Sequence, residues 1–303
     1  MRDSRSASPD DARLLHAACF FALFCVGFYA TSFGPALPFF ARKLNVDLDT
    51  AGLLITGIFV GSIIASGAVT LGLGRGQMRI AVATGLLVAS LGLFGLGFAH
   101  QWWVALGAVV LLGLGDGLIV AGAHVLIANT SRNVPAGITR LNLWFAVGAV
   151  CGPLWAGALL ANNFSLRPVY SGLGLVLLVG AALMAASRRS VEMRGDLAVP
   201  GGRATTFSGF IALMGLLLFL YVGAEIGLGS WVSSYAERTA GAGVFAAAGL
   251  VAGEPGAPLG ACALAGVAAG LAPAACLASA AGFAGVATAP VSVFCFLAGP
   301  AIG

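Results

Sequence analysis

A few polar side chains stand inside otherwise apolar runs of this sequence. Glu225 lies in the run 221–238, and Asp116 lies in an earlier run that also holds His124. A charged side chain at the centre of a membrane helix costs about 2.5–3.5 kcal/mol on insertion scales, so such residues usually face the protein interior and are often functional. A carboxyl group there can carry a proton or accept a hydrogen bond from a polar solute. We therefore expect Glu225 and Asp116 to be the ionisable groups of a binding site.

Structural roles are the alternative for these side chains. Glu225 would then hold two helices together, with Gly223 and Gly227, spaced four residues apart, giving a close-contact surface. Asp116 and His124 are separated by about 80° of rotation and about 12 Å of rise on an ideal helix, so they share a face without touching. One of them would relay protons or bind substrate, or His124 would be hydrogen-bonded across helices.

Two further side chains are candidates for substrate contacts. Asn142 has both a donor and an acceptor for solute hydroxyl groups, or it makes a structural bond between helices. Trp231 would stack on a sugar ring, or it would anchor a helix near the membrane surface.

The elements that carry these residues are membrane helices. The 303 residues are 59% hydrophobic and only 9% charged, with a mean hydropathy of +1.00 and 45 glycines. Strands of a membrane barrel would alternate polar and apolar residues, which this sequence does not do. We predict an all-α, polytopic membrane protein embedded in a lipid bilayer. Its spans, each long enough to cross a membrane, which takes about 20 residues, are expected at 14–39, 51–73, 80–99, 102–127, 141–160, 169–187 and 207–234.

Basic residues in the predicted loops orient the chain, since cytoplasmic loops carry the excess of Lys and Arg. Eleven basic residues would lie on one side of the membrane and four on the other, which places the N-terminus on the cytoplasmic side of a plasma membrane. A bacterial inner membrane is expected. The eleven are Arg2, Arg5, Arg13, Arg75, Arg79, Arg132, Arg140, Arg188, Arg189, Arg194 and Arg203, and the four are Arg42, Lys43, Arg167 and Arg238.

The spans fall into two unequal parts. We expect a six-helix membrane half at 1–187, a cytoplasmic linker at 188–206 and an incomplete second half at 207–303. An offset of 196 residues aligns the first span with the seventh, as in a parallel repeat. From about residue 244 to the end, Glu254 is the only charged residue, and Ala, Gly and Pro dominate. We interpret residues 244–303 as a truncated or out-of-frame extension.

Four stretches resemble the major facilitator superfamily, and within it the fucose and glucose permease-like branch. The loop 67–76 has the spacing of the family's gating loop, with Gly67, Gly74 and Arg75 matching and Leu71 in the place of an aspartate. The run GLGDGLIVAGAHVLIAN is similar to the branch's glycine-rich fourth helix, and VGAEIGLGSW to its seventh. The fifth predicted span has the family's GxxxGP motif at Gly148, Gly152 and Pro153.

The resemblance implies secondary transport of a small polar solute, such as a sugar, by alternating access, with protons as a candidate coupled ion. It also implies gating or conformational roles for Gly67, Gly74, Arg75, Gly148, Gly152 and Pro153. Ordinary positive-inside placement is the alternative for Arg75, and a close-packed helix bend is the alternative for the GxxxGP motif. A non-transporting remnant of such a transporter is the alternative for the whole chain.

Other function classes lack their signatures. The basic residues are scattered singly, which argues against nucleic-acid binding. The histidines and six cysteines lack metal-ligand spacing, and the glycine runs at 72–76 and 113–117 do not follow a strand of a nucleotide-binding unit. We therefore expect no metal, no cofactor and no enzyme activity.

Overall fold

The computed structural model describes residues 9–72 and 77–187, together with twelve single positions between 209 and 249. The continuous part forms six α-helices. They are α1 (Pro9–Leu44), α2 (Leu48–Gly72), α3 (Met78–Phe98), α4 (Trp102–Thr130), α5 (Val134–Ala161) and α6 (Leu166–Ala186).

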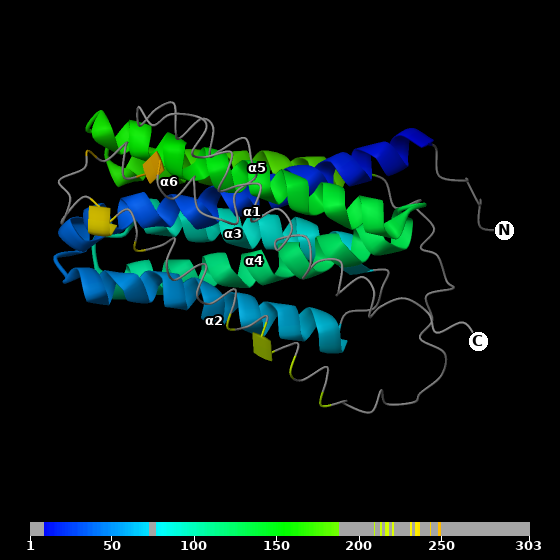
Figure 1. The fold of residues 1–303 in the computed structure, drawn as a ribbon, viewed down its shortest axis with the longest axis horizontal. Helices are drawn as coiled ribbons and strands as arrows, with labels where there is room; N and C mark the ends of the chain where they lie inside the picture. The colour runs from blue at the N-terminus through cyan, green and yellow to red at the C-terminus, as the bar shows by residue number, and fades with distance from the viewer. Residues whose placement is uncertain are drawn as a thin grey trace, which may run out of the picture.

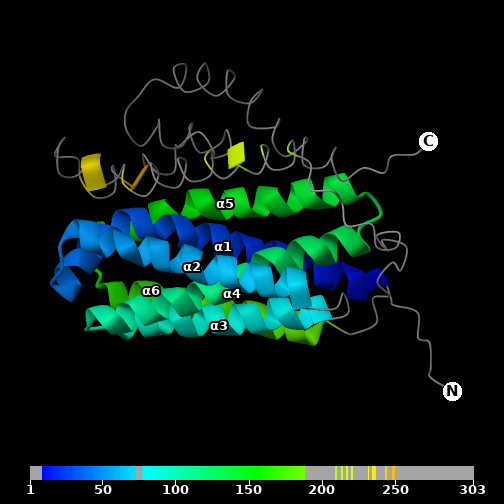
Figure 2. The same cartoon turned by 90° about the horizontal axis from the view of Figure 1, so that it is seen from below.

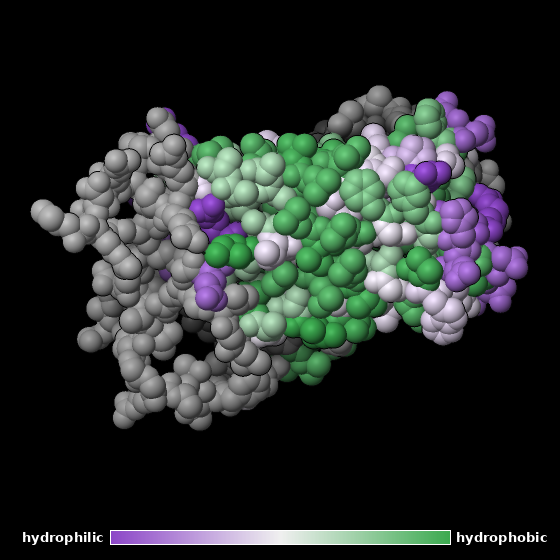
Figure 3. Space-filling model, turned by 180° about the vertical axis from the view of Figure 1, so that it is seen from behind, coloured by the Kyte–Doolittle hydropathy of each residue, from purple (hydrophilic) through white to green (hydrophobic). Residues whose placement is uncertain are grey.

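All six helices are long and apolar enough to cross a membrane. They lie side by side along the long axis of the bundle (Figure 1). Figure 3 shows a broad hydrophobic band across the described helices, with hydrophilic side chains gathered at one end. This distribution is the one expected of a bundle that faces lipid along its sides and water at its ends.

Helix α1 lies at the middle of the bundle. It contacts α5 most extensively and also packs against α6, α4 and α2, whereas α4 packs mainly against α3 and α2, and α3 also packs against α6. Figure 2 shows the result from a second direction, with α5 and α3 on opposite sides of the bundle. Helices α1 and α4 therefore bring the polar side chains of the central spans together.

Glycines allow the closest helix contacts. A Cβ atom at Gly148 or Gly152 of α5 would collide with the carbonyl oxygens of Phe24 and Phe28 in α1, and one at Gly27 of α1 would collide with the Phe145 carbonyl oxygen. Small residues at such positions let helix backbones approach, which favours packing in a membrane. The GxxxGP stretch is thus the contact surface of α5 for α1.

The ends of the helices follow local capping chemistry. Helix α5 begins at Val134, seven residues before the predicted start at 141, because the Asn133 side chain accepts a hydrogen bond from the Ala136 amide at 3.1 Å and Pro135 favours the first turn. Helix α1 is longer at both ends than the predicted span 14–39. The other four starts lie within three residues of those predicted.

The predicted linker at 188–206 lies outside the described residues, and most of the predicted second half at 207–303 does too.

Candidate functional site

Asp116 is the centre of a polar cluster that joins three helices. It lies at the midpoint of α4, and its two carboxylate oxygens each accept a hydrogen bond, one from the Tyr29 hydroxyl of α1 at 2.5 Å and one from the Ser62 hydroxyl of α2 at 2.8 Å. Tyr29 is buried, whereas Asp116 and Ser62 are partly exposed. The carboxylate of Asp116 therefore has two fixed donors, one on each oxygen.

The close packing of α4 against α2 places this cluster. A Cβ atom at Gly113 would collide with the Ile58 carbonyl oxygen, and one at Gly117 would collide with that of Ser62. These glycines lie on either side of Asp116 in sequence, so the backbone of α2 comes close enough for Ser62 to reach the carboxylate. The glycine run of α4 is thus a packing surface that positions Asp116.

His124 forms a second polar contact nearer the end of α4. Its Nδ1 lies 2.8 Å from the Val120 carbonyl oxygen, so Nδ1 carries a proton and donates; its Nε2 lies 3.3 Å from Oδ1 of Asn142 in α5. Two candidates that are eighteen residues apart in sequence thus meet across the α4–α5 contact.

A third contact links α4 to the beginning of α1. Nε2 of His16 lies 2.8 Å from the oxygen of the Thr130 hydroxyl, and this hydroxyl donates its hydrogen to the Leu126 carbonyl at 2.7 Å. Because α1 and α4 are antiparallel, the pairs Tyr29–Asp116 and His16–Thr130 lie about 20 Å apart along the same contact. Helix α4 therefore carries polar partners from its midpoint to its final turn.

The proline in α5 has a matched partner. Pro153 has no amide hydrogen, so it cannot bond the carbonyl of Ala149 four residues earlier. The Thr31 hydroxyl of α1 lies 2.9 Å from that carbonyl oxygen and 2.9 Å from the Gly27 carbonyl oxygen of its own helix, so the two carbonyls share its one hydrogen. Gly148, Gly152 and Pro153 thus form a close, internally satisfied contact with α1, and their predicted conformational role stays a prediction.

The structure describes only some of the remaining candidate residues. Trp231 is described and is 38% exposed, with its indole ring against Gly52 of α2. Gly67 has open space where a side chain would lie. Glu225, Gly74 and Arg75 lie outside the described residues, and their predicted roles stay predictions.

Arg79 acts on a helix end. Its guanidinium donates to the carbonyl oxygens of Met184 and Ala185, in the last turn of α6, at 3.2 and 2.9 Å. A cation there complements the helix dipole. Within the continuous described segments, no group of three or more His, Cys, Asp or Glu side chains is arranged to hold a metal ion. Cys19 and Cys25 are buried and form no disulfide.

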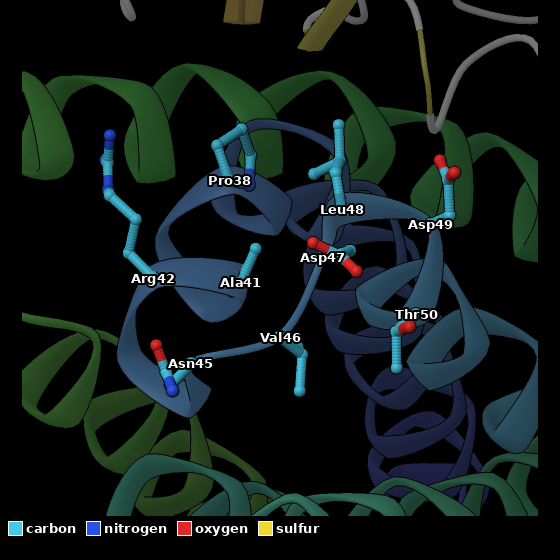
Figure 4. A pocket seen from close by; sticks show the side chains of 9 residues that line it. All are labelled: Pro38, Ala41, Arg42, Asn45, Val46, Asp47, Leu48, Asp49 and Thr50. Carbon is cyan, nitrogen blue, oxygen red and sulfur yellow. The ribbon is translucent and has the colours of Figure 1, made fainter.

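One end of the bundle and the surroundings of Tyr29 are also hollowed. A cavity of about 980 Å³ opens where α1 turns into α2, and Figure 4 shows polar side chains from both helices and the turn around it, including Arg42, Asn45, Asp47, Asp49 and Thr50. A smaller, apolar cavity of about 190 Å³ adjoins Tyr29 and is lined by Phe24, Phe28 and Trp155 among others.

Comparison with known proteins decides the family. Residues 19–303 match the Major Facilitator Superfamily. The chain belongs to this superfamily. It is therefore a multi-pass membrane protein of a transporter family rather than an enzyme, as the sequence predicts, and the superfamily match extends through residues 244–303.

Two relatives of this chain are multidrug resistance proteins. The protein MdtG of Citrobacter koseri is 35% identical over 155 residues, which are 48% of this chain and 37% of the relative. MdtG of Salmonella choleraesuis is 34% identical over 146 residues, which are 45% of this chain and 35% of the relative. The matched region thus spans little more than a third of these curated relatives.

Sequence reasoning missed the hydroxyl partners in this chain. Tyr29, Ser62 and Thr31 each bond to a neighbouring helix. Hydroxyl side chains occur often in membrane helices, since they can bond their own backbone at little cost, so residue type alone gave no signal. The tyrosine in the middle of the first span was the one available indication.

Proposed function

We propose that this chain moves a small organic solute across a membrane by alternating access, with Asp116 on the solute path at the middle of the bundle. The observation that carries the proposal is the carboxylate of Asp116, at the midpoint of α4, which accepts hydrogen bonds from hydroxyl groups of two other helices. An ionisable group within a membrane span is costly and is retained where it binds a solute or an ion. Membership of the superfamily supports the same reading.

The polar groups fit an amphipathic organic solute. Asp116, His124 and Asn142 offer one carboxylate, one imidazole and one amide, and aromatic side chains such as Phe24, Phe28 and Trp155 lie on the neighbouring surfaces of α1 and α5. An aromatic surface with few polar groups favours a largely apolar molecule with one hydrogen-bonding or cationic group. The printed names of the relatives, which are multidrug resistance proteins, support this class.

A sugar is the second candidate solute. Trp231 and Asn142 are the side chains that would stack on a ring and bond its hydroxyl groups. The proposed membership of the fucose and glucose permease-like branch rests on the sequence motifs alone. Under this alternative Trp231 and Asn142, rather than Asp116, would dominate solute affinity.

In the proposed orientation, the N-terminus lies on the cytoplasmic side of a bacterial inner membrane. Among the described loops, Arg132 follows α4 and Arg79 lies near the start of α3, whereas Arg42, Lys43 and Arg167 lie at the opposite end. The excess of basic residues on the side of Arg132, counted over the whole sequence, supports this orientation.

A transport measurement separates these alternatives. The full chain is reconstituted in proteoliposomes, and uptake of amphipathic cationic dyes and of monosaccharides is measured with and without a proton gradient. Saturable dye transport supports the proposal, whereas saturable sugar transport alone supports the permease-like alternative. Absence of flux for every solute, in vesicles that contain folded protein by circular dichroism, would identify a non-transporting remnant, as the predicted out-of-frame region 244–303 implies.

A further inference from the structure

A basic cleft lies between the ends of α1, α3 and α6. Its volume is about 370 Å³, and its lining includes Lys43, His100, Ser165 and Arg167, with Phe39 and Phe164 at its sides. These side chains come from the last turn of α1, the loop after α3 and the start of α6. None of them belongs to the polar cluster around Asp116.

The positive charge of this cleft is not balanced by the acids described nearby. Lys43 donates to the Gly97 carbonyl at 2.8 Å, and the Arg167 guanidinium lies 4.1 Å from the centre of the Phe98 ring. Both contacts hold a cation in place without neutralising it, and the two cations are close enough to act electrostatically on each other. The described acids at this end, Asp47 and Asp49, line the separate cavity at the α1–α2 turn.

The start of α6 adds backbone donors to the cleft. Helix α6 has 21 residues, and the side chain of its N-cap residue, Ser165, makes no capping bond. The first amide groups of a helix and the positive end of its dipole favour an anion. The cleft thus combines two cations, an exposed histidine, a hydroxyl group and a helix N-terminus.

The level of the cleft identifies the source of the anion. Phe164 is 51% exposed, and Trp103, in the first turn of α4 at the same end, is 75% exposed. Exposed aromatic residues at the ends of membrane helices lie at the depth of the lipid head groups. A phosphate group at that depth belongs to a phospholipid of the surrounding leaflet.

We propose that this cleft binds the phosphate of an anionic phospholipid, with Lys43 and Arg167 as the charged contacts and the exposed Phe164 against the start of the acyl chains. The lipid would join the ends of α1, α3 and α6. This site is separate from the proposed solute path, so the lipid proposal does not depend on the transport proposal.

Native mass spectrometry of the full chain, purified with a mixture of phosphatidylglycerol and phosphatidylcholine, tests the site. The unmodified chain retains phosphatidylglycerol preferentially. Arg167→Gln lowers this retention about fivefold, the effect of removing one cation near a membrane surface, and Arg167→Lys restores most of it. Equal retention of the two lipids by the unmodified chain would overturn the proposal without any variant.

Arg42→Gln is the matched control. Arg42 lies at the same end and stacks on Phe39, 4.4 Å from the ring centre, but it lines the other cavity. Unchanged retention in Arg42→Gln supports a defined site, whereas an equal loss would mean that general surface charge attracts the lipid. Full displacement of the lipid by millimolar inorganic phosphate would assign the cleft to a free anion and refute a lipid site.

Discussion

At the residue scale, the Asp116 carboxylate is the group whose surroundings are most completely defined. Hydroxyl groups from two different helices bond its two oxygens, so its position depends on α1, α2 and α4 together. Hydrogen bonds to a charged group contribute about 1.5–3 kcal/mol, more than those between neutral groups. Movement of any of these helices would change the environment of the carboxylate, as the role proposed for Asp116 in transport requires.

Two serines with similar bonds give a matched pair of variants. Ser62 donates to Asp116 at 2.8 Å, and Ser90 of α3 donates to the Gly174 carbonyl of α6 at the same distance. We expect Ser62→Ala to lower the solute transport rate about tenfold, since a bond to a charged group is lost. Ser90→Ala changes that rate less than twofold, because the carbonyl keeps its helix bond. Equal effects in flux assays would place Asp116 off the solute path.

The contact between His124 and Asn142 is open to a double-mutant cycle. His124→Ala, Asn142→Ala and the double variant are compared by their free energies of unfolding in detergent. We expect a coupling energy of about 0.6 kcal/mol, typical of hydrogen bonds between membrane helices. A coupling energy indistinguishable from zero would mean that the 3.3 Å contact contributes nothing to helix association.

Much of this site could be predicted from residue type alone. Asp116 and His124 stood out because ionisable groups are rare in apolar spans, and Asn142 because its amide can bond on both sides. The pairing of His124 with Asn142, and the choice of Tyr29 and Ser62 as the partners of Asp116, depend on helix rotation and crossing. A linear sequence does not give those quantities.

At the scale of helices, glycine contacts determine how closely the backbones approach. Gly27, Gly148 and Gly152 join α1 to α5, and Gly113 and Gly117 join α4 to α2. The glycines of α4 and α5 also carry the sequence resemblance to the superfamily, so the motifs and the packing have one physical cause. Helix positions were predicted well because apolar length sets a membrane span, whereas the start of α5 depended on the Asn133 cap.

Gly148→Ala and Gly172→Ala test the glycine contacts. A methyl group at Gly148 collides with the Phe24 carbonyl oxygen, whereas one at Gly172 in α6 meets nothing within 4 Å. We expect Gly148→Ala to lower the free energy of unfolding by about 1–3 kcal/mol, the usual cost of overpacking. Gly172→Ala is neutral or slightly stabilising because alanine favours helix. Thermal unfolding in detergent gives both values, and equal stability of the two variants would refute the contact.

At the scale of the whole molecule, the bundle separates polar from apolar surface. Hydrophilic side chains gather at an end, and the band between the ends is apolar (Figure 3). The superfamily match runs to residue 303, although the composition changes after about residue 244. The predicted frameshift therefore gains no support from the match and stays a prediction. Composition alone could not tell a frameshifted segment from native membrane helices, since alanine and glycine are common in such helices.

Labelling at the two ends of α4 tests the proposed orientation. Gln101→Cys and Arg132→Cys, each made in a variant without the native cysteines, place one exposed thiol before and one after this helix. We expect a membrane-impermeant maleimide added to intact cells to label the thiol at position 101 and to label that at position 132 only after lysis. The reverse pattern would place the basic side outside and contradict the positive-inside assignment.

The most direct test of the account is the transport of a cationic dye by Asp116→Asn in proteoliposomes, beside the unmodified chain and Ser90→Ala. The amide keeps the size of the side chain but can bear neither a charge nor an exchangeable acidic proton. We predict that Asp116→Asn folds with an unchanged circular dichroism spectrum and loses at least tenfold in gradient-driven transport, while Ser90→Ala retains it. Undiminished gradient-driven transport in Asp116→Asn would contradict the assignment of this carboxylate to the solute path.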